Sequence, residues 1–241
     1  MPKKIDAYRR DATSDAYHGF YANAVEALSL MTLSKDPKCD GALKETLLKS
    51  CLVLLVACWE SFIEDLLRQS MHTIITHAKS PDDLPKLLKR CVANDLKNDN
   101  HDFAVWDLAE DGWKNVLMKH IEKNIAGFHN PKASNIDVLF KTSLGLENLS
   151  SSWESEQLNT SELSLALKKM IEQRGEIAHT VKLSQLFTEA DLNTFGWVLI
   201  ILSGMTINCL RQYIIDIVKV EPWPLEQEDQ LQGLIGRYRN G

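Results

Sequence analysis

Residues 51–64, with the sequence CLVLLVACWESFIE, decide the fold class of this chain. They lie in a segment from about Leu43 to Ala78 that contains neither Gly nor Pro. The first half of this segment is apolar almost all round, and a helix of that kind belongs in the centre of a bundle. We therefore predict an all-α helical bundle with long central helices, one of which covers residues 43–78.

Apolar periodicity and end signals predict further helices on both sides of this segment. They cover about residues 5–33, 81–94, 103–125, 136–144, 160 to the motif at 174–179, and 188–218. The start signals are Ser80-Pro81, Ser134-Asn135, Thr160–Glu162 and Thr188–Asp191, and Gly145 is a stop signal. Residues 1–241 are predicted to form a single all-helical domain, with an N-terminal helical extension (1–40) and a C-terminal amphipathic tail (222–241). Residues 150–153 are the best candidate for a break between two halves of this domain.

The net charge of −6 argues against a protein that coats nucleic acid without specificity, because phosphate attracts positive surfaces. A small local cluster of Lys and Arg could still bind a nucleic acid. The five cysteines are odd in number and show no C-x-x-C pair, so we expect buried, reduced thiols and a cytoplasmic location. No signal peptide follows Met1, and polar residues dilute the uncharged stretch 192–210. We read that stretch as a core helix without membrane contact.

The most informative segment is Ile171-Glu-Gln-Arg174-Gly175-Glu176-Ile-Ala-His179-Thr180. Gly costs about 1 kcal/mol relative to Ala inside a helix, and here it follows an Arg in an otherwise apolar pattern. Such a local conflict is typical of a functional site. On one straight helix, positions 174 and 179 lie about 140° apart and roughly 7.5 Å along the axis. Either the helix ends or bends at Gly175, or Arg174 and His179 meet the same pair from a second chain.

These two side chains suit the cleavage of RNA without a metal. The planar guanidinium of Arg174 can donate two parallel hydrogen bonds to a phosphate. The imidazole of His179 can take or give a proton near neutral pH. Lys168, Lys169 and Lys182 flank the motif and are candidates for RNA binding. The alternative is that Arg174 and His179 have no function and are either solvated or ion-paired with Glu172 and Glu176. Short motifs of this kind also match by chance.

The segment Arg174-Gly-Glu-Ile-Ala-His179 resembles the Arg–His signature of HEPN proteins, above all the RiboL-PSP-HEPN group. Residues 57–64 and 130–145 show a weaker likeness, and the resemblance covers roughly residues 40–215. It implies a homodimer that brings two motifs into one cleft, RNA cleavage by attack of the 2′-hydroxyl, and no cofactor. Many relatives act in toxin–antitoxin or phage-defence systems, so an antitoxin or a nucleotidyltransferase is a possible partner. Active members often carry Asn, Asp or His after the Arg, whereas this chain has Gly175.

Two carboxylates are further candidates for catalysis. Glu60 follows Trp59 in an apolar stretch, where an unpaired carboxylate would be costly. It could orient Arg174 or His179, or it could lie hydrated or paired at the edge of the buried face. Glu176 lies within the motif itself. His72 and His77 lack metal-ligand spacing and are expected to be exposed. The sequence places no candidate ligand or catalytic partner near His101, His120 or His129. No metal site is predicted.

The function predicted from the sequence is therefore that of a dimeric, metal-independent endoribonuclease centred on Arg174 and His179. The alternative is a non-catalytic HEPN-like module that binds a nucleotide or a protein and keeps the Arg and His as a structural pair.

Overall fold

The computed structural model describes residues 14–99, 101, 103–154, 159–180 and 188–224. Within these residues the chain is an all-α bundle without strands, as predicted. The seven α-helices of this part are α1 (Asp15–Leu33), α2 (Gly41–His77), α3 (Lys86–Lys97), α4 (Gly112–Ala126), α5 (Ala133–Leu144), α6 (Thr160–Thr180) and α7 (Glu189–Val218). Three short 3-10 helices lie between them: η1 (Pro81–Asp83), η2 (Ala104–Leu108) and η3 (Leu149–Ser152).

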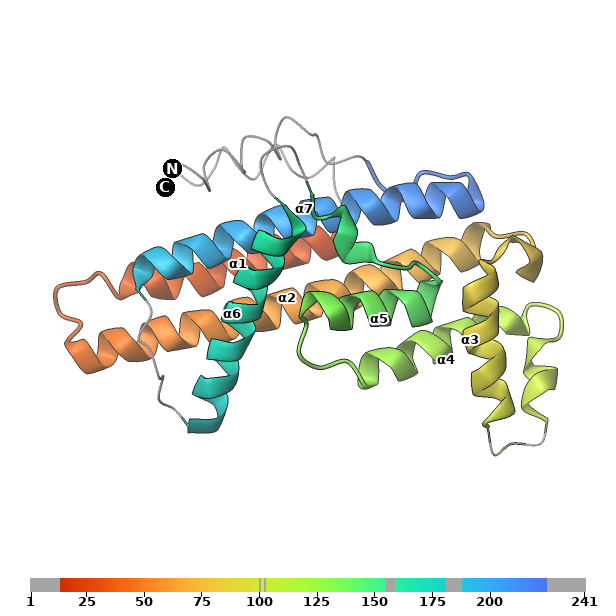
Figure 1. Ribbon diagram of the computed structural model, residues 1–241, viewed down its shortest axis with the longest axis horizontal. Coiled ribbons are helices and arrows are strands. Elements are labelled where there is room, and N and C mark those ends of the chain that lie inside the picture. Colours follow the sequence, from red (N-terminus) through yellow and green to blue (C-terminus); the bar gives the residue numbers. More distant parts are fainter. Residues whose placement is uncertain (1–13, 100, 102, 155–158, 181–187, 225–241) are drawn as a thin grey trace.

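Three long helices, α1, α2 and α7, run side by side along the longest axis of the molecule (Figure 1). α2 is the central helix, and its side chains Leu52, Leu55 and Ile63 are 0% exposed. It begins at Asp40, whose carboxylate accepts a hydrogen bond from the Leu43 backbone N–H at 2.8 Å. The prediction of a central helix over residues 43–78 is confirmed.

α7 begins and ends where the sequence predicts. Thr188 and Asp191 form a capping box, in which each side chain accepts a hydrogen bond from the backbone N–H of the other residue. Leu192, Val198 and Ile201 of this helix are 0% exposed, because α7 packs between α1 and α2 on one side and α6 on the other. The uncharged stretch 192–210 is thus a core helix of the bundle.

The shorter helices cover the long ones. α4 and α5 pack against α2, and α3 lies across the end of α4 and α5 (Figure 1). α6 crosses α2 at a steep angle and contacts both α2 and α7 (Figure 1). This crossing leaves the C-terminal end of α6 at the edge of the bundle.

Two buried tryptophans join segments that are distant in the sequence. The indole N–H of Trp59 donates to the Pro131 carbonyl at 3.0 Å, and that of Trp153 donates to the Thr206 hydroxyl at 2.9 Å. The two rings meet edge to face with centroids 6.4 Å apart, and both side chains are 0% exposed. Residues 150–153, expected as a break between two halves of the domain, therefore contribute to the one core.

Two helix starts differ from the prediction. Ser80 and Asp83 form a capping box around η1 alone, and α3 starts only at Lys86. The helix expected over residues 103–125 is interrupted between η2 and α4, because the chain turns tightly after Leu108. A side chain at Gly112 would collide with the Asp107 carbonyl, so this turn requires glycine.

The start of α5 is also corrected. The helix begins at Ala133 with Lys132 as its N-cap residue, and no side chain caps it. Asn135, expected to be part of the cap, instead donates to the carbonyls of His129 and Asn130. At the other end Gly145 adopts the left-handed conformation of a C-cap, as predicted.

Two helices, α2 and α7, are long and apolar enough to cross a bilayer by length and composition alone. Half of the most apolar window of α2 and 61% of that of α7 are buried inside the bundle. Core helices of bundles share these properties, so the observation is weak support for a membrane span.

Candidate active site

The motif at 174–179 lies on the last two turns of α6, which continues as an α-helix to Thr180. Of the alternatives that the sequence left open, a helix that ends at Gly175 is therefore wrong. A Cβ atom added at Gly175 would meet nothing within 4 Å. Gly175 is thus not required by packing within one chain, and it leaves open space beside Arg174.

The burial of α6 changes along its length. Leu163, Leu167 and Met170 are 0% exposed and face the core, whereas residues 173–177 are partly buried and residues 178–180 are exposed. The α6 helix therefore leaves the bundle as it reaches the motif. Arg174 lies on a partly buried turn, and His179 lies in solvent.

Arg174 has no hydrogen-bond or ion-pair partner among the residues that the structure describes. The sequence suggested Glu172 as an alternative ion-pair partner of Arg174. Its carboxylate instead lies 3.7 Å from the Lys168 ammonium. None of the ion pairs in the described ranges joins Arg174 to Glu176. Arg174 is a partly buried residue, and cations that lose contact with water are normally paired. Arg174 is thus available for an anionic ligand.

His179 and Arg174 remain on different faces of the same helix. Because their positions are five apart on continuous α-helical backbone, they are about 140° apart around the axis and about 7.5 Å along it. One chain therefore presents two separate reactive groups. A cleft that contains both needs a second surface opposite α6.

Glu60 is partly buried on α2, and no hydrogen bond or ion pair in the described residues joins it to Arg174 or His179. Its neighbour on the next turn, Glu64, pairs with Arg68 at 3.5 Å. Burial raises the pKa of Glu64, Arg68 lowers it, and the nearby charge of Glu60 raises it further. Within one chain Glu60 therefore belongs to a row of carboxylates along α2, apart from the motif residues.

The structure describes two of the three lysines that were predicted to bind RNA. Lys168 and Lys169 are exposed on α6, and Lys169 lies 3.8 Å from the carboxylate of Asp191 on α7. Glu176 is partly buried, and its carbonyl accepts a hydrogen bond from the Thr180 hydroxyl at 2.8 Å. Lys182 lies outside the described residues.

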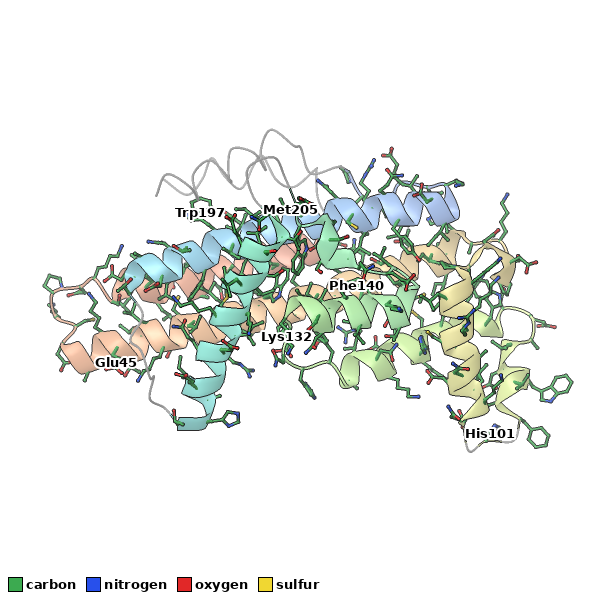
Figure 2. The ribbon with its side chains drawn as sticks, viewed as in Figure 1. Glu45, His101, Lys132, Phe140, Trp197 and Met205 are labelled. Atoms are coloured by element: carbon green, nitrogen blue, oxygen red, sulfur yellow. The ribbon has the colours of Figure 1, made fainter. Side chains whose placement is uncertain are left out.

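The structure adds two groups to this region that sequence reasoning did not single out. The side-chain carbonyl oxygen of Gln173 is buried and has no hydrogen-bond partner. Lys132, labelled in Figure 2, lies at the end of α5 that is nearer to α6, and the two helices are in contact. A buried acceptor on α6 and a further cation at the neighbouring end of α5 both suit a polar ligand. Only the three-dimensional packing of α5 and α6 reveals them.

The remaining histidines divide into two groups. His72 and His77 are exposed, as predicted. His120, for which no partner was expected, is instead buried, with Nδ1 2.5 Å from Asp95 and Nε2 2.9 Å from the Thr142 carbonyl.

In the part of the chain that the structure covers, no group of three His, Cys, Asp or Glu residues could hold a metal ion.

Comparison with known families places this chain. The family model described as RiboL-PSP-HEPN matches residues 21–215, a stretch that runs from α1 to the last turn of α7 and includes the whole motif. No curated protein and no solved structure matches with significance.

Proposed function

The chain belongs to the RiboL-PSP-HEPN family, and on that basis we propose that it is a metal-independent RNA endonuclease that acts as a homodimer. HEPN domains are nuclease-like or RNA-related modules, so the family supports an RNA substrate. The observation that carries the proposal is that Arg174, a partly buried residue two turns from the exposed end of α6, has no partner among the described residues. A structural arginine would have its carboxylate, and this one keeps its donors for a phosphate.

The proposed reaction is an attack of the ribose 2′-hydroxyl on the adjacent phosphorus. His179 of one protomer accepts the proton of the 2′-hydroxyl as the O2′–P bond forms. The bond from phosphorus to the 5′-oxygen breaks, and the second protomer's imidazole supplies the proton to that leaving oxygen. Arg174 binds the non-bridging oxygens and stabilises the charge of the phosphorane. The products are a 2′,3′-cyclic phosphate and a free 5′-hydroxyl.

A homodimer solves the geometric problem posed by α6. Because Arg174 and His179 lie on different faces of one helix, a second α6 related by a two-fold axis would complete a cleft between the two motifs. Leu165, which is 67% exposed on α6, would gain an apolar neighbour in the same interface.

The direct test is incubation of the purified protein with RNA in the presence of EDTA. We expect cleavage that leaves 2′,3′-cyclic phosphate ends and that is reduced at least about 100-fold by Arg174→Ala or His179→Ala. Matched controls are Arg90→Ala on α3 and His101→Ala, which remove an exposed Arg and an exposed His far from the motif. Cleavage that persists in the His179→Ala protein would place the active site elsewhere.

A mixing experiment tests the shared cleft. Arg174→Ala and His179→Ala proteins are each expected to be inactive alone. After they are mixed and exchange subunits, the mixed dimer holds one Arg and one His. One of the two proton transfers then lacks its imidazole, so only a small part of the activity should return. Absence of complementation together with a monomer in light scattering at micromolar concentration would rule out a composite site.

A second candidate function is a non-catalytic module that binds a nucleotide or a protein, and Gly175 favours it. This residue leaves one polar group fewer beside the phosphate than the resembling active proteins have. RNA binding that depends on Arg174 but is never followed by cleavage would support this alternative.

The biological setting is a further part of the proposal. We infer a cytoplasmic toxin or phage-defence component, restrained by an antitoxin or a nucleotidyltransferase. The free cysteines of the described residues fit a reducing compartment. Induced expression should arrest growth of the host cell, and His179→Ala should relieve the arrest. Equal growth arrest by the wild-type and His179→Ala proteins would show that toxicity does not depend on the motif.

A further inference from the structure

The end of the bundle formed by α3, η2 and the start of α4 carries an unusual concentration of exposed apolar side chains. In the short segment 103–108, Phe103 is 65% exposed, Val105 62% and Trp106 75%. Single exposed apolar residues are common, but a contiguous aromatic and aliphatic group is typical of an interaction surface. We define Phe103, Val105 and Trp106 as the η2 apolar patch.

A cavity of about 340 Å³ lies directly beside this patch. Val105 and Leu108 of η2, Ala93 and Leu96 of α3, and Leu117 of α4 contribute to its lining. Its floor is the core itself, because Val92 and Leu117 are at most 6% exposed. A cavity of this size suits one large apolar side chain of a partner, held in place by the rim.

The charges around the cavity indicate the chemistry of the occupant. The charged residues that line it are both lysines, Lys89 and Lys97, and both lie on α3. Lys89 donates a 3.5 Å hydrogen bond to the Asp82 backbone carbonyl, and no ion pair in the described residues neutralises either lysine. An apolar floor with a cationic rim is complementary to a segment that carries acidic residues next to its apolar face.

We propose that the η2 apolar patch and its cavity form a docking site for an amphipathic, acidic segment of a partner protein. An apolar anchor of that segment fills the cavity, Trp106 and Phe103 cover it, and acidic side chains lie against Lys89 and Lys97. The site is distant from α6, which crosses the bundle nearer its other end (Figure 1). A dimer formed through α6 would therefore leave both copies of the docking site accessible.

The experiment uses the full chain and two synthetic helical peptides. One carries Leu and Trp at positions i, i+3, i+4 and i+7 with Glu at the flanking positions, and the other replaces each Glu with Lys. We expect the Glu peptide to bind at least about tenfold more tightly in a fluorescence anisotropy titration. Equal binding of both peptides, or no binding of either, would overturn the proposal.

Three variants test the location and the charge. Ala93→Trp fills the cavity and should abolish binding, whereas Leu33→Ala, an exposed apolar residue on α1, should have no effect. Lys89→Glu combined with Lys97→Glu should reverse the preference in favour of the Lys peptide. Unchanged binding by the Ala93→Trp protein, checked for native helicity by circular dichroism, would place the site elsewhere. Conversion of a dimer to a monomer by Trp106→Ala would show that the surface is an interface between copies of this chain.

Discussion

His179 and His120 are the same residue type in opposite situations. His120 is buried among α3, α4 and α5, and both of its ring nitrogens lie within hydrogen-bond distance of oxygen atoms of Asp95 and Thr142. His179 is exposed at the end of α6 and has no described partner. The arginines repeat the contrast. Arg68 lies within ion-pair distance of Glu64, Asp65 and Glu122, whereas Arg174 has no such neighbour in the described part of the chain.

This difference suggests that His120 and Arg68 contribute to stability, whereas His179 and Arg174 contribute to function. Side chains whose donors and acceptors are used inside the chain hold helices together, and their loss destabilises the fold. Side chains whose donors are unused remain available for a ligand, and their loss should affect activity alone. Substitutions at the two histidines, at Gly175 and at Asp95 can test this division.

The largest effect is expected on activity. Arg174→Ala and His179→Ala should reduce RNA cleavage at least about 100-fold and leave the free energy of unfolding within about 0.5 kcal/mol of the wild-type value. Parallel cleavage assays and urea denaturation at pH 7 measure the two quantities. A large loss of stability in either variant would show that the motif also holds the fold together and would break the comparison.

The reverse result is expected for His120. His120→Ala removes two hydrogen bonds and leaves the Thr142 carbonyl at the end of α5 without its partner, so stability should fall by about 2–3 kcal/mol. Urea denaturation measures the loss, and His101→Ala, which changes an exposed ring, is the control. RNA cleavage by the folded fraction should be unchanged. If the stability of the His120→Ala protein equals that of the control, the buried contacts do not contribute as described.

A smaller gain in stability is expected at Gly175. Because α6 is helical there and a Cβ atom would meet nothing within 4 Å, Gly175→Ala should stabilise the protein by about 1 kcal/mol. Thermal unfolding monitored by circular dichroism measures the gain. Gly175→Asn, which adds a polar group beside Arg174, should in addition increase RNA cleavage. A decrease in both properties would mean that another surface packs closely on this position, as a second α6 would.

The smallest effect is a dependence of stability on pH at Asp95. Burial raises the pKa of the Asp95 carboxyl, but hydrogen bonds from Lys123 and His120 outweigh it, so the pKa lies below its usual value. The ionised carboxylate therefore stabilises the fold fully above the unfolded pKa near about 4, and this contribution is lost as the pH falls through the lower folded pKa. Asp95 is partly exposed, which weakens the effect by solvent screening.

Urea denaturation of the wild-type and Asp95→Asn proteins between pH 7 and pH 3 measures this contribution. The difference in stability should be greatest at pH 7 and should shrink in the acidic range. Glu172→Gln, which alters an exposed ion pair 3.7 Å long, is the control and should show little difference at any pH. A difference for Asp95→Asn that is constant with pH would contradict the assignment.

The parts of the fold that could be predicted from the sequence are those set by local chemistry. The central helix follows from its apolar periodicity, α7 from the Thr188 capping box, and the end of α5 from Gly145. The interruption between η2 and α4 could not be predicted, because it depends on the backbone of Asp107 passing close to Gly112. Whether the helix ends at Gly175 was left open by the sequence, because it depends on the packing of the preceding turns on α2 and α7, which outweighs the weak helix propensity of one residue.

The residues of the candidate site could be named from the sequence, but their contacts could not be predicted from it. Arg174 and His179 could be named from residue type and spacing, whereas their lack of partners depends on where Glu172 and Glu176 point. His120 was overlooked because its partners lie 25 and 22 residues away in the sequence. Lys132 and the buried amide of Gln173 likewise gain significance only once α5 and α6 are in contact.

The hydrogen bond between Trp153 and Thr206 has a consequence for biosynthesis. The two residues are 53 positions apart, and Thr206 lies near the middle of α7. A growing polypeptide therefore cannot finish its interior until residue 206 has left the ribosome exit tunnel. Because α6 packs on α7, the motif at 174–179 cannot reach its native position until α7 has been synthesised as well.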